Sequence, residues 1–65
     1  MIYLNSTAIH AVSYNPTTKT LTIWFTSSGR SYDYYGVPES VYEGLLNAGS
    51  KGHYFNVYIR DQYAA

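Results

Sequence analysis

The clearest pattern of hydrophobic and polar positions lies in residues 19–27, where Leu21, Ile23 and Phe25 alternate with threonines and Trp24. Period-two alternation with β-branched and aromatic residues is typical of a strand with one buried face. We expect the first three side chains to face the core. Trp24 is then predicted to stand on the opposite face of the sheet.

Two further strands are predicted beside this one. Residues 8–15 mix apolar and polar positions without clean alternation, which a single β-bulge would explain. In residues 30–35, Tyr32 and Tyr34 share one face of the predicted strand. Ser31, Asp33 and Tyr35 share the other face. The strand over residues 30–35 therefore presents two tyrosines on a single face, next to the alternating strand of residues 19–27.

Short turn signals connect the three strands in an antiparallel meander. Asn15 followed by Pro16 suits a type I turn between the first two strands. Gly29 supplies a positive φ at little cost in the hairpin that precedes the third strand. Residues 3 and 4 are expected only to dock the N-terminus.

The period changes to that of a helix after Gly36. Residues 38–48 carry an apolar stripe at helical spacing, formed by Val41, Tyr42, Leu45 and Leu46. Pro38 is predicted at the first helical position, where no N–H donor is needed. Gly49 is predicted to cap the helix in the left-handed region.

A second helix is predicted over residues 50–60, with Ser50 as its N-cap. Its buried stripe would be Phe55, Tyr58 and Ile59. Residues 61–65 form a tail in which Tyr63 packs back on the domain. The predicted fold is α+β: a three-stranded antiparallel β-meander followed by two helices packed on one sheet face, in a single domain of residues 1–65.

Composition explains how so small a chain is stabilised. The chain has 65 residues and no cysteine, so neither a disulfide nor a thiolate–metal site is available to it. Nine tyrosines, two phenylalanines and one tryptophan supply large buried areas per residue instead. Oligomerisation is the other compensation open to such a domain.

Charge and hydropathy narrow the classes of function. Four basic and four acidic residues balance, so the basic footprint of phosphate-backbone binding is missing, and any nucleic-acid contact would rest on stacking and a few local charges. The N-terminal residues show neither a signal peptide nor a membrane-spanning run. We expect a cytoplasmic protein without membrane association.

Enzymatic chemistry is not indicated. The two histidines, His10 and His53, are not accompanied by the cluster of ligands that a metal site requires. Ser50 lies close to His53, but a serine at a helix start is typically a cap. Glycine-rich phosphate loops are absent. We therefore predict a protein that is not an enzyme and that holds neither a metal nor another cofactor.

The ordered pieces of the chain together resemble the KTSC domain family. The resemblance rests on Ser6, Ile9 and Tyr14; Leu21 and Phe25; Tyr32-Asp33-Tyr34; Val37-Pro38, Val41-Tyr42, Leu45 and Ala48; and Ser50-Lys51-Gly52-His53-Tyr54-Phe55-Asn56, Ile59 and Tyr63. The family occurs as an extension at the C-terminus of some lysyl-tRNA synthetases and as stand-alone proteins of bacteria and phages. Trp24 and Tyr35 depart from its pattern.

The resemblance implies no established activity. RNA binding has been suggested for the family by its association with the synthetase. Exposed bases in RNA commonly stack on aromatic rings, and the start of the second helix offers N–H groups beside a lysine and a histidine. The candidate binding residues are Trp24, Tyr32, Tyr34, Ser50, Lys51, His53, Tyr54, Asn56 and Arg60.

Two hypotheses remain open at this point. The first is a non-catalytic module that binds RNA weakly through these residues. The second is a protein-interaction module or phage accessory protein that acts through an aromatic sheet face around Trp24, with self-association as a homodimer included. Tyr32 and Tyr34 have the alternative role of covering the core.

Overall fold

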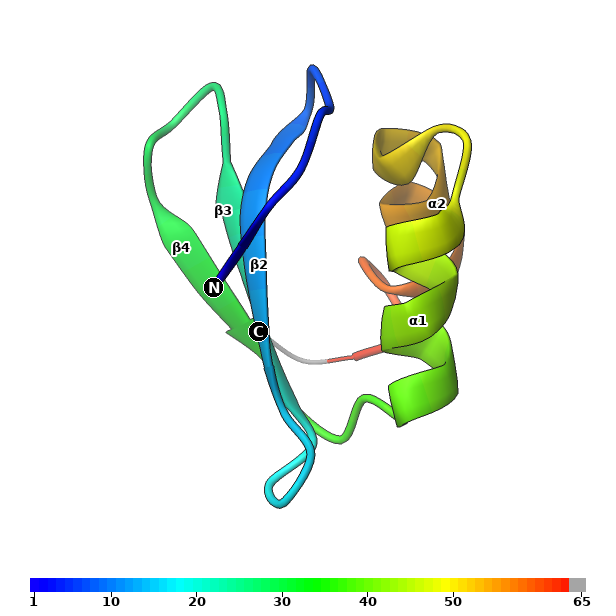
Figure 1. The fold of residues 1–65 in the computed structure, drawn as a ribbon. Helices are drawn as coiled ribbons and strands as arrows, with labels where there is room; N and C mark the ends of the chain where they lie inside the picture. Colours follow the sequence, from blue (N-terminus) through cyan, green and yellow to red (C-terminus); the bar gives the residue numbers. More distant parts are fainter. Residues whose placement is uncertain (64–65) are drawn as a thin grey trace.

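A computed structural model describes residues 1–63, which form a four-stranded antiparallel sheet with two helices on one of its faces (Figure 1). The strands lie in the order of the sequence. The elements are β1 (Ile2–Tyr3), β2 (Ile9–Asn15), β3 (Thr20–Phe25), β4 (Ser31–Tyr34), α1 (Glu39–Asn47) and α2 (Lys51–Tyr58). The predicted α+β class and the placement of both helices on one face are confirmed.

The number of strands was predicted wrongly, because β1 adds a fourth strand at the edge of the sheet. Ile2 lies opposite Val12 of β2, and Tyr3 lies opposite Ala11. A strand of two residues is too short to show an alternating pattern. Its place is fixed by pairing with β2, which the chain's own periodicity does not encode.

The predicted bulge in β2 is confirmed. The register between β2 and β3 shifts between Ile9 and Ala11, so that His10 is the extra residue. The shift lets Ile9 and Val12 both face the helices, where each is fully buried. The irregular sequence pattern of β2 thus follows from one inserted residue.

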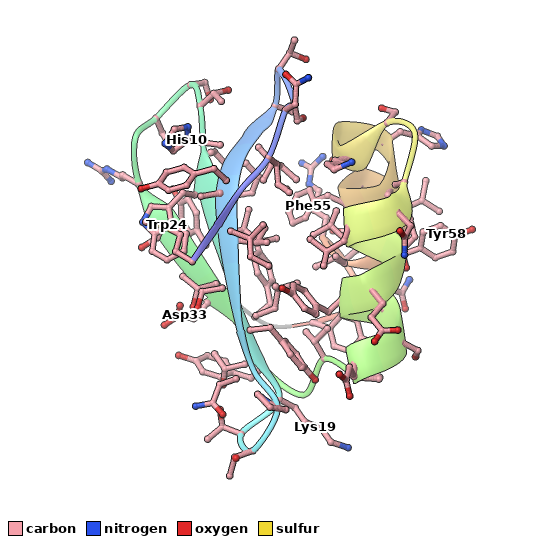
Figure 2. All side chains as sticks on the ribbon, in the orientation of Figure 1. His10, Lys19, Trp24, Asp33, Phe55 and Tyr58 are labelled. Atoms are coloured by element: carbon pink, nitrogen blue, oxygen red, sulfur yellow. The ribbon has the colours of Figure 1, made fainter. Side chains whose placement is uncertain are left out.

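The core lies between the sheet and the helices. Leu21 and Ile23 of β3 are fully buried in it, and Phe25 is half-buried against it, as the alternation predicts. Tyr34 pairs with Leu21 and is buried on the same face. Trp24 faces away from the helices, also as predicted (Figure 2).

The turn between β2 and β3 is fixed by hydrogen bonds and also positions the segment that leads into α1. The side-chain oxygen of Asn15 accepts bonds from the N–H groups of Thr17 and Thr18, at 3.0 and 3.4 Å. Lys19 then adopts a positive φ of 56°, which its residue type does not predict. Its carbonyl accepts from the N–H of Val37 at 2.9 Å, so this turn anchors the segment that leads into α1.

The ends of α1 differ from the prediction. Pro38 is extended, with φ −65° and ψ 151°, and is the N-cap rather than the first helical residue. Gly49 does not have a positive φ; Ala48 is the C-cap and is extended. The Ala48 carbonyl accepts a bond from the Lys51 ammonium at 2.9 Å, so the chain passes directly into α2 without a left-handed cap.

The start of α2 and the burial of Phe55 and Ile59 are as predicted, but the end of the helix and the burial of Tyr58 are not. Ser50 caps the start of α2, with Oγ accepting from the N–H of His53 at 3.4 Å. The helix stops at Tyr58 because the N–H groups of Ile59 and Arg60 both bond to the carbonyl of Phe55. The predicted extension to residue 60 is therefore wrong.

The two large aromatics of the predicted stripe in α2 separate. Phe55 points toward the sheet and is 8% exposed, whereas Tyr58 points away from it and is 54% exposed (Figure 2). Tyr54 packs against the core instead, and its hydroxyl donates to the carbonyl of Val41 at 3.1 Å. Tyr58 lies against Tyr54, with ring centroids 4.6 Å apart, on the outer side of the helix layer.

Helix α1 packs as its stripe predicts. Leu45 is buried, and Val41, Tyr42 and Leu46 pack against the core. Tyr63 also packs there, while the last two residues of the predicted tail, 64–65, lie outside the described residues. Within residues 1–63, neither helix has the length and apolar content needed to cross a bilayer.

Candidate functional site

The surface is hollowed where the start of α2 meets the segment that leads into β2. A polar hollow of about 270 Å³ is lined by Asn5, Ser6, Thr7, Ala8, Gly49, Ser50, Lys51 and Gly52. A second hollow of about 260 Å³ is lined by Thr7, Ala8, Ile9, Phe25, Thr26, Ser27, Gly52, Phe55 and Asn56. Because the two share Thr7, Ala8 and Gly52, they adjoin, and we call them together the α2 groove.

Two local features shape the α2 groove. Ser6 Oγ accepts bonds from the N–H groups of Ala8 and Ile9, at 3.2 and 3.3 Å, which curves the chain before β2. Gly52 lies so close to this segment that a Cβ there would be 3.0 Å from the Cβ of Ala8. A side chain at this position would require the first turn of α2 or the segment to shift by a few tenths of an ångström.

The polar end of the groove carries one cation. Lys51 is one of the lining residues, and its ammonium donates a bond to the Ala48 carbonyl at 2.9 Å. Neither hollow is lined by an acidic residue. In a chain whose formal charges cancel, this lining has a local positive excess that favours an anionic group.

The other end of the groove is aromatic. Phe25 and Phe55 meet edge to face with centroids 5.1 Å apart, and Phe25 also contacts Tyr32 at 5.7 Å. Tyr34 contacts Phe55 at 5.5 Å. Tyr34 is only 7% exposed, so it serves the core, whereas Tyr32 is 42% exposed at the β4 edge. We call these four residues the aromatic cluster.

Arg60 is electrostatically close to this cluster. Burial raises the pKa of Tyr34 above 10.0, as does the neighbouring Tyr32, while the positive charge of Arg60 lowers it. Arg60, which follows α2, and Lys51, which begins it, therefore place cations at the two ends of this helix.

The remaining candidates on α2 have different surroundings. His53 is exposed on the first turn, and Asn56 is exposed and lines the aromatic hollow. Tyr54 is half-buried, and burial is the largest cause of its raised pKa. Because its hydroxyl bonds to Val41, Tyr54 joins the two helices rather than offering a free ring.

Trp24 does not lie with the other candidates. It stands on the face of the sheet that the helices leave open, where Figure 2 also shows His10 and Asp33. Tyr3 and Trp24 flank Ala11 in neighbouring strands, and the ring of Tyr3 meets His10 at 5.3 Å. Ala11 is fully buried although it is on the open face. The structure thus separates the predicted residues into two surfaces.

The part of the groove formed by residues 5–8 was not predicted from the sequence, and neither was the position of Tyr3 on the open face. Nothing in a linear pattern indicates that this segment meets Gly52, which is over forty positions later. Among residues 1–63, no group of three or more His, Cys, Asp and Glu side chains is arranged to hold a metal ion.

Comparison with known proteins identifies the domain. The family model of the KTSC domain matches residues 5–63. The crystal structure of a KTSC domain protein from Yersinia pestis superposes with a TM-score of 0.90 at 32% identity, over 95% of this chain and 86% of that one. A protein of Tsukamurella paurometabola is 37% identical over 62 residues, which are 95% of this chain and 91% of the relative.

Longer relatives share the same segment. A lysine–tRNA ligase of Nostoc sp. is 51% identical over 55 residues, which are 85% of this chain but 10% of the ligase. A ligase of Nostoc punctiforme is 49% identical over a segment of equal length. The chain thus spans about a tenth of the length of the ligases that it matches.

Proposed function

Because the chain belongs to the KTSC domain family, we propose that it is a small non-catalytic module of the cytoplasm that binds RNA. The binding surface would be the α2 side, which we define as the α2 groove together with Tyr32, His53 and Arg60. Similarity to a segment of enzymes named as lysine–tRNA ligases supports RNA as the ligand, since tRNA is the substrate in that name.

The observation that carries this proposal is that cations border α2 at both ends while aromatic residues line the hollow along it. Lys51 lies at one end of α2 and Arg60 beyond the other. The aromatic hollow lies along the same helix, with Tyr32 exposed beside it. Proteins that bind single-stranded RNA combine a cationic path for the backbone with rings on which bases stack.

The charge balance sets the expected strength. With a formal net charge of zero, the protein offers only the local cations of the α2 side to phosphates. For single strands, each neutralised phosphate contributes a slope of about −0.7 in log K against log salt. We expect weak binding that is detectable at low salt and falls with a slope of roughly −1 to −2.

Fluorescence anisotropy with labelled single-stranded and hairpin RNA tests the proposal. Arg60→Gln should weaken binding about fivefold, which corresponds to roughly 1 kcal/mol. Arg30→Gln is the matched control, because Arg30 is exposed in the loop between β3 and β4 and should leave affinity unchanged. Absence of binding at low salt, or equal losses in the two variants, would contradict the proposal.

A second candidate function is protein interaction through the open sheet face. The half-buried Trp24 and the 67% exposed Tyr3 support it, since they flank Ala11 on a face without a covering layer. If a second copy binds there, light scattering should show a dimer, and Trp24→Ala should weaken it by about 2 kcal/mol or more. A protein that stays monomeric at high concentration would exclude self-association through this face.

A further inference from the structure

We propose that the α2 groove is a site for a single RNA nucleotide, with the phosphate in the polar hollow and the base in the aromatic hollow. This inference rests on the proposed function and makes it more specific. The proposed function places RNA anywhere on the α2 side. The present inference places one nucleotide of that RNA in the two adjoining hollows.

The polar hollow has the chemistry of a phosphate site. Lys51, Ser50 and Asn5 are among its lining residues, and no acidic residue is. The hydrogen bond that Lys51 Nζ donates to the Ala48 carbonyl restricts the position of the ammonium. A positioned cation costs less side-chain entropy on binding than a free surface lysine does.

The aromatic hollow has the chemistry of a base site. The half-buried Phe25 supplies apolar ring surface above the buried Phe55, and Asn56 is exposed with an amide that both donates and accepts hydrogen bonds. Bases splayed from single-stranded RNA are recognised by stacking and by hydrogen bonds to their edges. The hollow therefore suits a planar heterocycle better than an aliphatic side chain.

The dimensions of the groove agree with one nucleotide. The hollows measure about 270 and 260 Å³ and meet at Thr7, Ala8 and Gly52, so a ligand can occupy both at once. Together they fall within the range of about 300–1,000 Å³ that is typical of small-molecule sites. The polarity changes from one hollow to the other, as it does along a nucleotide from phosphate to base.

Amide chemical-shift mapping of the labelled protein tests this assignment, with uridine and adenosine 5′-monophosphates, the corresponding nucleosides and inorganic phosphate as probes. The monophosphates should shift the amides of residues 5–8, 49–52 and 55–56. The nucleosides should shift mainly the amides around Phe55, and phosphate mainly those around Ser50. The spectrum of each variant reports at once whether it is folded.

Two pairs of variants separate the halves of the site. Lys51→Gln keeps a donor for the Ala48 carbonyl and should weaken monophosphate binding about fivefold while leaving nucleoside binding unchanged. Lys19→Asn is its control, because asparagine tolerates the positive φ of that turn. Asn56→Ala should weaken both kinds of probe, whereas Asn47→Ala, on α1, should weaken neither.

The outcomes distinguish this inference from the proposed function. If RNA binds but its shifts map to another surface, the nucleotide site is wrong and RNA binding stands. If RNA shifts the groove amides but the monophosphates shift none, the single-nucleotide assignment is also wrong. If neither RNA nor nucleotides bind at low salt, both proposals fail.

Discussion

At the scale of single residues, Phe55 holds the layers together. It lies between α2 and the sheet, touches Phe25 and Tyr34 and is 8% exposed. Phe55→Ala should lower the free energy of unfolding by about 3–5 kcal/mol. A domain of this size has roughly that much stability in total, so the variant should be largely unfolded at room temperature.

Chemical denaturation followed by circular dichroism measures this loss. Val57→Ala is the matched control on the same helix, because Val57 is 46% exposed and should change stability by less than about 0.5 kcal/mol. A cooperative transition of Phe55→Ala close to that of the wild type would mean that Phe55 does not belong to the core.

At the scale of elements, the contact between α1 and α2 depends on a glycine. Gly44 of α1 faces the ring of Tyr54, and a Cβ at this position would overlap the Tyr54 hydroxyl. Gly44→Ala should therefore destabilise the protein by about 1–3 kcal/mol, although alanine alone favours a helix by about 1 kcal/mol.

Thermal melts of Gly44→Ala and Gly49→Ala test this packing. A Cβ at Gly49 has no atom within 4 Å, and Gly49 is not in the left-handed region, so its replacement should be neutral or slightly stabilising. A Gly44→Ala variant as stable as Gly49→Ala would show that α1 and α2 pack less closely than described.

The elements differ in how far the sequence predicts them. The alternation of β3 and the stripe of α1 extend over enough residues to define a face, and both faces are as predicted. In α2, Tyr54 and Tyr58 present similar apolar area at the same spacing as Phe55 and Ile59. Which pair is buried depends on contacts with α1 and the sheet, so periodicity alone assigned Tyr58 wrongly.

The candidate site was less predictable than the fold. Ser50 and Lys51 were recognised from local helix-start chemistry, which depends on neighbours in sequence. The groove itself arises where Gly52 meets Ala8 and where Phe25 meets Phe55. These contacts join segments that are far apart in the chain. The facing of Trp24 was predictable by contrast, because the alternation of β3 places it opposite the core side of the sheet.

At the scale of the whole molecule, the tyrosine-rich core predicts sensitivity to alkali. Burial raises the pKa of Tyr34, Tyr42 and Tyr54 above the ordinary value of 10.0. The fold therefore favours the neutral phenols over the phenolates. Their contribution to stability is complete below pH 10 and is lost as the pH rises through the raised pKa values of the folded state.

Urea denaturation from neutral pH to about pH 12 measures this loss, with phenolate absorbance recorded in parallel. Tyr42→Phe should decline less steeply above pH 10, because it removes one ionisable group that stacks on Tyr14. A stability that stays constant while all tyrosines ionise would show that the buried phenols do not oppose ionisation.

The central claim is that RNA binds the α2 side, and photo-crosslinking measures the contact surface directly. RNA carrying photoreactive uridine is irradiated with the protein at low salt, and the modified peptides are sequenced. We predict crosslinks at Phe25 and Tyr32, with few at Trp24 or Tyr3. Crosslinks concentrated on Trp24 and Tyr3 would place the RNA on the open sheet face and contradict the account.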